Sequence, residues 1–198
     1  MLAFEPVPGN VALLRENVLD NGLERTVEIV SKALGNRVGS VQLAAELGGA
    51  GNAWVTEGVP TREIDAHART GRHDLARLVT CEMVRLDDYL KTSSLRCSLV
   101  KLDVEGFELE VIQGAEARIA RDRPVIVGEF SERWLRSRGA MSGWIDEWAH
   151  RKAYRLFSVR KRSRRFLDRP EYNVAPLERY TPGLDIVLVP EEQVKAVP

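Results

Sequence analysis

Charged residues interrupt an apolar stretch between positions 101 and 108, which reads Lys-Leu-Asp-Val-Glu-Gly-Phe-Glu. The alternation of a strand places Lys101, Asp103 and Glu105 on one side, away from the Leu and Val side chains. An unpaired charge is costly to bury, so these side chains must pair with one another or face a polar site. Two interpretations stay open: the rim of a site, or a Lys101–Asp103 ion pair followed by a capped helix.

The same stretch contains a glycine and a further carboxylate that suit a ligand-binding turn. Gly106 can take a positive φ or let the backbone approach a ligand closely at the strand-to-helix turn. Glu108 falls in the first turn of the next helix, where the helix dipole favours an anion. Glu129 repeats the pattern near the carboxyl end of the following apolar run. Two such interruptions on successive strands favour a shared cleft, and a Glu paired with a nearby Arg or Lys is the structural alternative.

Another acidic residue, Glu5, follows the short apolar segment Leu2–Phe4 and precedes Pro6. If this segment is the second strand of a nucleotide-binding half, Glu5 lies at its carboxyl end, where a carboxylate can accept hydrogen bonds from both ribose hydroxyls. A surface Glu before a turn is the simpler explanation, and the Glu-Pro pair on its own favours it.

The elements that must position these residues alternate between strand and helix patterns. A helix with Val11, Leu13, Leu14, Val18 and Leu19 on its apolar stripe follows the first strand and stops at Asn21-Gly22. The other predicted elements are a hairpin of strands 26–34 and 40–45, an irregular connection over 47–80, a short helix at 86–90, strands at 98–104 and 125–130, a helix from 109 to 123, a helix over 134–151, and strands at 154–159 and 184–189. This order predicts an α/β fold with one doubly wound sheet, mostly parallel with an antiparallel last strand, in a single domain over residues 1–198. Ligands bind at the carboxyl ends of the strands of such sheets.

The composition excludes several function classes. The 198 residues contain 29 Lys and Arg against 29 Asp and Glu, so no overall field attracts the protein to nucleic acid or to an acidic membrane. Cys81 and Cys97 are predicted to be reduced thiols, and no apolar run approaches the roughly 18 residues of a membrane-spanning helix. We expect a cytoplasmic protein with neither nucleic acid nor membrane as a partner. The basic run Arg160–Arg165 is predicted to be a solvated loop, with contact to an anionic glycan as an alternative.

Taken together, the order and spacing of these motifs resemble the FkbM family of methyltransferases. The resemblance rests on Ala3-Phe4-Glu5-Pro6, the helix through Leu14, Asn17 and Asn21-Gly22, Ala33-Leu34-Gly35, Leu86-Asp87-Asp88, the stretch Lys101–Glu108, and Glu129. The Lys-x-Asp-Val-Glu-Gly-x-Glu pattern is its most specific part. The resemblance implies a Rossmann-like methyltransferase fold and S-adenosylmethionine as the methyl donor. It also implies that the acceptor is usually a hydroxyl of a sugar, a glycan or a polyketide-like natural product.

Carried over position by position, the resemblance implies two groups of site residues. The cofactor-binding group comprises Phe4, Glu5, Pro6, Ala33, Leu34 and Asp103, with Glu5 on the ribose, Ala33 and Leu34 against the adenine, and Asp103 beside the amino-acid or reactive end. The catalytic group comprises Lys101, Asp103, Glu105 and Glu129. In it, Glu105 and Glu129 are candidates to hold the acceptor hydroxyl or to remove its proton. A divalent metal on Asp103, Glu105 and Glu129 is the less favoured alternative, and no metal is predicted.

The sequence departs from the family at its beginning. The strand and glycine-rich turn that the family places before Phe4 are absent, because the chain starts at Met1. We expect this to leave unpaired edges on two neighbouring strands and to remove part of the donor site. A fragment, a wrongly chosen start and a natural remnant all fit this departure. A truncated, non-catalytic remnant or binding module is therefore the alternative function, and no oligomeric state is predicted.

Overall fold

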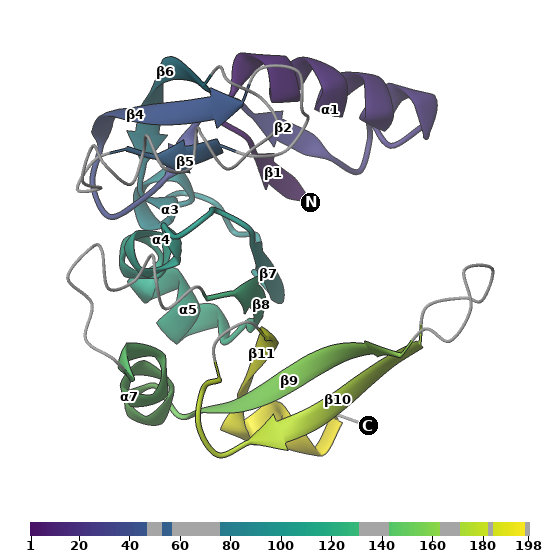
Figure 1. Cartoon of the computed structure of the whole chain (residues 1–198), viewed down its shortest axis with the longest axis vertical. Coiled ribbons are helices and arrows are strands. Elements are labelled where there is room, and N and C mark those ends of the chain that lie inside the picture. The colour runs from purple at the N-terminus through teal and green to yellow at the C-terminus, as the bar shows by residue number, and fades with distance from the viewer. Residues whose placement is uncertain (47–52, 57–75, 131–142, 163–170, 182–183, 197–198) are drawn as a thin grey trace. The chain divides into compact units, whose positions relative to one another are not determined.

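The computed structural model describes residues 1–46, 53–56, 76–130, 143–162, 171–181 and 184–196 (Figure 1). These residues form two compact units. Unit 1 comprises Met1–Ser93 and Val104–Ala115, and unit 2 comprises Ser94–Asp103 and Glu116–Pro198. Both contain strands and helices, so the predicted mixed α/β fold is confirmed. The single domain over residues 1–198 stays a prediction.

Unit 1 begins with a parallel strand pair joined by a helix. β1 (Leu2–Phe4) pairs with β2 (Glu28–Val30), and α1 (Pro8–Asp20) connects them. Pro8 suits the start of α1 because the first helical N–H groups have no partner within the helix. Gly22, at φ 64°, reverses the chain after α1, as the Asn-Gly stop signal predicted. Among the predicted stripe residues, Val11 and Val18 are buried, whereas Leu13 and Leu19 are exposed.

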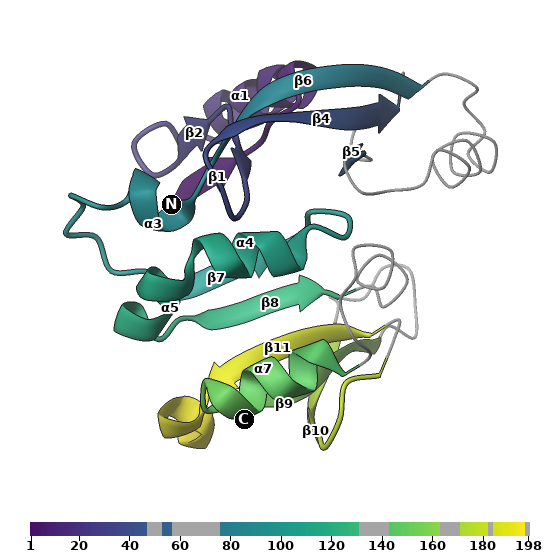
Figure 2. The same ribbon diagram turned by 90° about the vertical axis from the view of Figure 1, so that its left-hand side faces the viewer.

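The second sheet of unit 1 has the order β3-β6-β4-β5. Its strands are β3 (Ala33–Leu34), β4 (Gly39–Glu46), β5 (Ala53–Val55) and β6 (Ala76–Val84). Figure 2 shows β4 and β6 as a long antiparallel pair. The predicted hairpin between residues 26–34 and 40–45 is therefore wrong, because β3 and β4 both pair with β6 instead. β5 and part of β6 occupy the connection that was predicted to be irregular.

The described part of unit 1 also contains two short helices, α3 (Leu86–Tyr89) and α4 (Glu108–Gly114). α4 approaches the turn after β3 so closely that a Cβ on Gly114 would lie 2.8 Å from the carbonyl carbon of Gly35. Asn36 Nδ2 in the same turn donates a hydrogen bond of 2.9 Å to Gln113 Oε1 on α4. The lack of a side chain at Gly114 therefore allows α4 to pack directly against the turn after β3.

Unit 2 is built around one five-stranded sheet with the order β10-β9-β11-β8-β7. β7 (Leu99–Leu102) and β8 (Val125–Glu129) are parallel, and β11 (Asp185–Pro190) lies antiparallel between β8 and β9 (Tyr154–Arg162). β10 (Glu171–Leu177) forms a hairpin with β9 (Figure 1). The helices in the described part of unit 2 are α5 (Glu116–Asp122), α7 (Trp144–Arg151) and the 3-10 helix η1 (Glu191–Ala196). Ile126, Phe130, Ile186 and Leu188 are fully buried and form the centre of the core.

The described residues form three sheets, so the single doubly wound sheet predicted from the sequence is not confirmed. Alternating patterns predict that strands exist, but they do not say which strands pair. Within the described residues, β1 pairs with β2 alone and β7 with β8 alone. Leu99 on β7 is 63% exposed, whereas Leu102 on the same strand is buried.

Two helix predictions need correction. The helix predicted from residue 109 to 123 is divided into α4 and α5 at Ala115. Of the helix predicted over 134–151, α7 forms the second part, and residues 134–142 lie outside the described ranges. Among the helices of the described ranges, none has the length and apolar character needed to cross a membrane.

Candidate active site

Glu5 lies where the predicted ribose-binding carboxylate should be, directly after β1. Its N–H donates to the Val30 carbonyl at 3.1 Å, which extends the pairing of β1 with β2 by one residue. Its half-buried side chain accepts a hydrogen bond from the Val7 N–H at 2.8 Å through Oε1. Val7 is the residue before α1 and has no side-chain cap. Glu5 therefore stabilises the start of α1, and this contact also fixes the orientation of its carboxylate.

Ala33 and Leu34 form β3, the strand predicted to lie against the adenine. Ala33 is buried and Leu34 is half-buried. The Cys81 thiol on β6 forms a hydrogen bond with the backbone of Ala33 and lies within electrostatic range of Glu5. Burial raises the pKa of this thiol, and the Glu5 charge adds to the shift. The structure thus brings Glu5, Ala33 and Cys81 to the same part of unit 1.

Phe4, another predicted cofactor-binding residue, is half-buried in unit 1. Its ring packs edge-on against Tyr89 of α3, with 5.2 Å between the ring centroids. The Tyr89 hydroxyl donates to Glu28 Oε1 at 3.3 Å, and desolvation, followed by the Glu28 charge, raises the pKa of Tyr89. Pro6 is half-buried beside Glu5. Tyr89 and Cys81 are two residues near the predicted cofactor group that the sequence analysis did not single out.

The Lys101–Glu108 stretch is divided between the units after Asp103. In unit 2, Lys101 Nζ lies 2.5 Å from Asp103 Oδ2, and about two thirds of each side chain is exposed. The ion pair considered from the sequence is therefore present. An exposed pair of this kind contributes about 0–1 kcal/mol to stability, so its stability role is small.

The turn between Asp103 and α4 has an unusual backbone. Glu105, a non-glycine residue, has φ 47°, and Gly106 has φ 91°. The predicted positive φ at Gly106 is confirmed. For Glu105 this conformation costs roughly 1–3 kcal/mol, and such strain is concentrated at functional sites. The Glu105 side chain is exposed. Contacts elsewhere in the turn must offset the energetic cost of its backbone conformation.

Glu108 is the first residue of α4, and its carboxyl group is buried. The residue is 1% exposed, and its Oε1 accepts the Gly106 N–H at 3.0 Å. Oε2 is also buried and has no hydrogen-bond partner within the described residues. Burial raises the pKa of Glu108 to about 7. The predicted position of Glu108 in the first turn of the helix is confirmed. The sequence analysis expected an anion stabilised by the helix dipole and did not predict that the side chain is buried.

Glu129 ends β8 and lies next to other acidic residues of unit 2. Leu102 on β7 pairs with Gly128 on β8, so Asp103 and Glu129 each follow this pair at the carboxyl ends of adjacent parallel strands. Asp185, at the start of β11, is the direct register partner of Glu129. The structure therefore brings Asp103 and Glu129 to one edge of the sheet and adds Asp185, which the sequence analysis missed. In the part of the chain that is described, no group of three or more His, Cys, Asp or Glu side chains is arranged to hold a metal ion.

A convergence of Glu5 with Asp103 and Glu129 involves both units and stays a prediction. Each unit contributes its own part of the predicted site. Unit 1 contains Glu5 with Ala33, and it also contains Glu105. Unit 2 contains the other predicted carboxylates.

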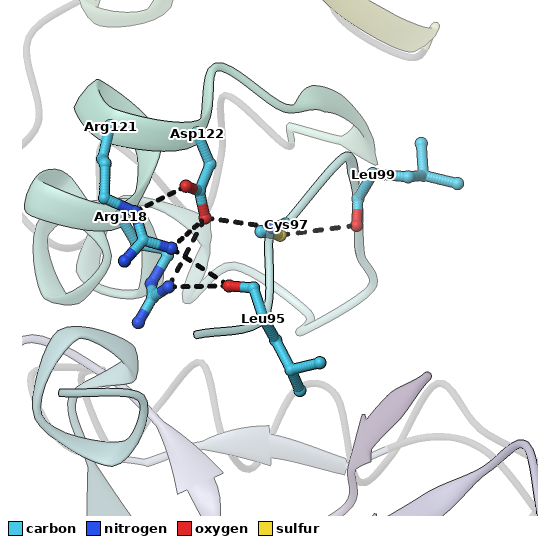
Figure 3. A network of polar contacts seen from close by, with 6 residues as sticks. All are labelled: Leu95, Cys97, Leu99, Arg118, Arg121 and Asp122. Atoms are coloured by element: carbon cyan, nitrogen blue, oxygen red, sulfur yellow. Dashed lines mark hydrogen bonds and ion pairs between the residues drawn. The ribbon is translucent and has the colours of Figure 1, made fainter. Parts of the chain in front are cut away.

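A buried polar network lies at the opposite, amino end of β7 and β8 (Figure 3). Asp122 accepts hydrogen bonds from Arg121 at 2.6 and 2.9 Å and from the Cys97 N–H at 2.9 Å, and it lies 3.5 Å from the buried Arg118. Arg118 and Arg121 also both donate to the Leu95 carbonyl at 3.0 Å. The Arg121 hydrogen bond outweighs desolvation and lowers the pKa of Asp122 to about 2. These contacts connect the end of α5 to the segment that enters β7.

A pocket of about 510 Å³ lies beside this network and is lined by Arg96, Ser98, Asp122, Arg123, Glu192 and Gln193. Arg123 in its wall binds Glu192 at 2.8 and 2.9 Å and the carbonyls of Lys152 and Ala153 at 2.6 and 2.8 Å. Gln193 donates to the Arg123 carbonyl at 2.9 Å. Arg118, Arg121 and Arg123 thus all have specific partners. We assign the pocket a structural role, because it lies at the wrong end of the strands for a ligand of an α/β sheet.

Comparison with known proteins identifies the family. Residues 1–156 match the methyltransferase FkbM domain family. The chain belongs to this family. Among solved structures, a methyltransferase FkbM from Methylobacillus flagellatus is similar, with 13% sequence identity and a TM-score of 0.49 over 94% of this chain and 36% of that chain. The present chain therefore spans little more than a third of that protein, and no residue role is taken from it. None of the curated proteins compared with the chain matches it.

The matched FkbM region includes every predicted site residue, from Phe4 to Glu129. The family resemblance predicted from the motifs is thus confirmed. The basic run Arg160–Arg165 lies outside the match. Arg160–Arg162 belong to β9 rather than to the predicted loop, and residues 163–165 lie outside the described ranges.

Proposed function

We propose that this FkbM chain binds S-adenosylmethionine and transfers its methyl group to a hydroxyl of a sugar, a glycan or a related natural product. The observation that carries the proposal is the half-buried Glu5 carboxylate, which the Val7 N–H orients at the carboxyl end of β1. We further propose a Rossmann-like fold for this chain, a cytoplasmic location, and partners that include neither nucleic acid nor a membrane. The balanced charge of the chain supports the exclusion of these two partners.

The residues of unit 1 fit the nucleoside part of this donor. A carboxylate oxygen accepts more than one hydrogen bond, so Glu5 can bind ribose hydroxyls while it keeps the Val7 contact. Phe4, Pro6, Ala33 and Leu34 supply partly buried apolar surface beside it, which suits a purine ring. The orientation of Glu5 exists before any ligand binds, which reduces the ordering cost of binding.

The carboxylates near the ends of β7 and β8 are the proposed catalytic residues. When bound, S-adenosylmethionine would supply the methyl group: a carbon–oxygen bond would form to the acceptor as the carbon–sulfur bond breaks, and S-adenosylhomocysteine would leave. Asp103, oriented by Lys101, would orient the reactive end of the donor. Glu105 and Glu129 would hold the acceptor hydroxyl or take its proton. Positioning and desolvation would account for most of the rate, with a smaller share from the general base.

A second candidate is a binding module without catalysis. The observation that favours it is the ion pair between Lys101 and Asp103, since a carboxylate paired in solvent needs no ligand to balance its charge. The two candidates make different predictions about the donor. Only the enzyme requires S-adenosylmethionine or its product to bind.

Calorimetric titration with S-adenosylhomocysteine tests the proposal through Glu5. Glu5→Ala removes the carboxylate, and the loss of hydrogen bonds to a charged group should weaken binding roughly 10- to 100-fold. Glu5→Gln keeps an acceptor for the Val7 N–H but loses the charge, so it separates capping of α1 from ribose binding. Glu16→Gln, at an exposed position on α1, is the matched control and should bind like the wild type. If the wild type shows neither heat nor a thermal shift at millimolar ligand, the enzyme proposal fails for this chain.

A further inference from the structure

The buried carboxyl group of Glu108 is the titratable group that the proposed reaction does not use. It shares one face of α4 with Phe107, Val111 and Ile112, all of which are at most 6% exposed. Within the described residues it forms no ion pair. A carboxyl group in such surroundings costs several kcal/mol when it is charged, so a stability role alone does not explain its presence.

The Glu108 carboxyl group forms a hydrogen bond within the strained turn. Its Oε1 accepts the Gly106 N–H at 3.0 Å, two residues before it in the chain. That N–H belongs to the peptide that joins Glu105 and Gly106, both of which have positive φ. The Phe107 N–H donates to the Val104 carbonyl at 3.2 Å and closes the same turn. The Glu108 bond therefore acts on the peptide group whose conformation is least favourable.

We infer that Glu108 is a positioning residue whose buried carboxyl group holds the Gly106 amide, and through it keeps Glu105 in the left-handed conformation that aims its carboxylate at the acceptor. This inference rests on the proposed function for the role of Glu105. The hydrogen bond itself does not depend on that function.

The electrostatic surroundings make this bond sensitive to protonation. Desolvation raises the pKa of Glu108 to about 7, and the charges of Glu105 and Glu110 add to the shift. α4 packs against β3, which has no titratable side chain, and against α3. The titratable side chains of α3 are Asp87, Asp88 and Tyr89. An ionised carboxylate is the stronger acceptor, so the Gly106 N–H should be bound more tightly above neutral pH.

The test measures the Gly106 amide by nuclear magnetic resonance in the full chain, with no ligand. In the wild type, its chemical shift should titrate with a midpoint near pH 7. Glu108→Gln keeps an acceptor oxygen but cannot titrate, so the transition should disappear while protection of the amide from solvent exchange is retained. Glu108→Ala should increase the exchange rate roughly tenfold, as expected for the loss of one hydrogen bond. Glu16→Gln should leave the titration and the exchange rate unchanged.

The inference is overturned if the Gly106 amide shows the same titration in Glu108→Gln as in the wild type, or unchanged protection in Glu108→Ala. Should the alanine variant not fold, the glutamine titration still decides. For the enzyme, Glu108→Ala should lower kcat with the acceptor at least tenfold more than it weakens S-adenosylhomocysteine binding. Failure of the donor to bind at all would instead refute the proposed function, while the amide measurements would still test the hydrogen bond.

Discussion

Replacing Gly114 by alanine should destabilise unit 1, although alanine is the better helix former. A Cβ at this position would overlap the Gly35 carbonyl oxygen, and it would lie 2.8 Å from the carbonyl carbon of Gly35 and 3.4 Å from the Cα of Asn36. Ordinary carbon–carbon contacts are about 3.5–4.0 Å long, so the backbones must separate by roughly 0.7 Å or more. All three obstacles are main-chain atoms and cannot turn aside as a flexible side chain could. Overpacking of this kind costs about 1–3 kcal/mol, and the rigid contact points to the upper end.

The opposing effect is smaller. Alanine gains about 1 kcal/mol over glycine inside a helix, and Gly114 is the last residue of α4. Gly35 cannot yield easily, because its N–H donates to the Val84 carbonyl at 3.0 Å and its own Cβ position is enclosed by Met83 and the Phe107 ring. The net loss should therefore be about 2 kcal/mol. Gly9→Ala in α1 is the matched control, since a Cβ there meets nothing within 4 Å. That variant should be as stable as the wild type or slightly more stable.

Urea unfolding and hydrogen exchange measure both variants. A loss of about 2 kcal/mol should lower the urea midpoint by roughly 1 M, given the usual denaturant dependence of small proteins. It should also speed exchange of the Gly35 amide about 30-fold if that amide exchanges through opening of unit 1. Should Gly114→Ala prove as stable as Gly9→Ala, the close backbone contact between α4 and the turn after β3 would be refuted.

Two further predictions concern pH and the buried acids. Asp122→Asn should lower the free energy of unfolding by about 3 kcal/mol at neutral pH, because Arg118 stays buried without its charge partner. The folded state lowers the pKa of Asp122 from 3.8 to about 2, so the stabilisation is present above pH 3.8 and is lost as the pH falls towards 2. Free energies of unfolding measured by urea titration should therefore converge for the two proteins near pH 2. A difference that stays constant with pH would contradict the assignment. Glu108→Gln should show the opposite dependence. Burial raises the pKa of Glu108 from 4.5 to about 7, so the wild type should lose about 3 kcal/mol of unfolding free energy relative to the variant as the pH rises from 4.5 to 7. If the melting temperatures of the two proteins differ by the same amount throughout this range, the shift is excluded.

The local elements bounded by proline and glycine could be predicted from the sequence. Pro6 and Gly22 mark the ends of β1 and α1, and Pro124 separates α5 from β8, because each residue changes the backbone locally. The pairing of strands could not be predicted. β4 pairs with β6 across a connection of about 30 residues. The residue pattern of either strand does not predict which strand it pairs with. β10 was not predicted, and it contains Pro176; it is an edge strand, where a missing N–H is tolerated.

The candidate site shows the same division between local and tertiary information. The positive φ at Gly106 follows from the residue type and its place between strand and helix. The burial of Glu108 could have been found from spacing, since Val111, Ile112 and Ala115 follow it at the helical intervals of one buried face. The approach of Cys81 to Glu5 depends on how β6 lies beside β3, which no local pattern contains.

The interleaving of the two units determines how the chain can be divided experimentally. The chain passes from one unit to the other after Ser93, after Asp103 and after Ala115. A fragment cut after Ser93 loses α4, and with it the helix that encloses the Gly35 turn. A separately expressed unit 1 therefore needs residues 94–103 replaced by a short Gly/Ser linker, so that α4 remains covalently attached. The reciprocal fragment needs a linker in place of residues 104–115 to keep β7 beside β8, and a library of terminal truncations would yield neither unit intact.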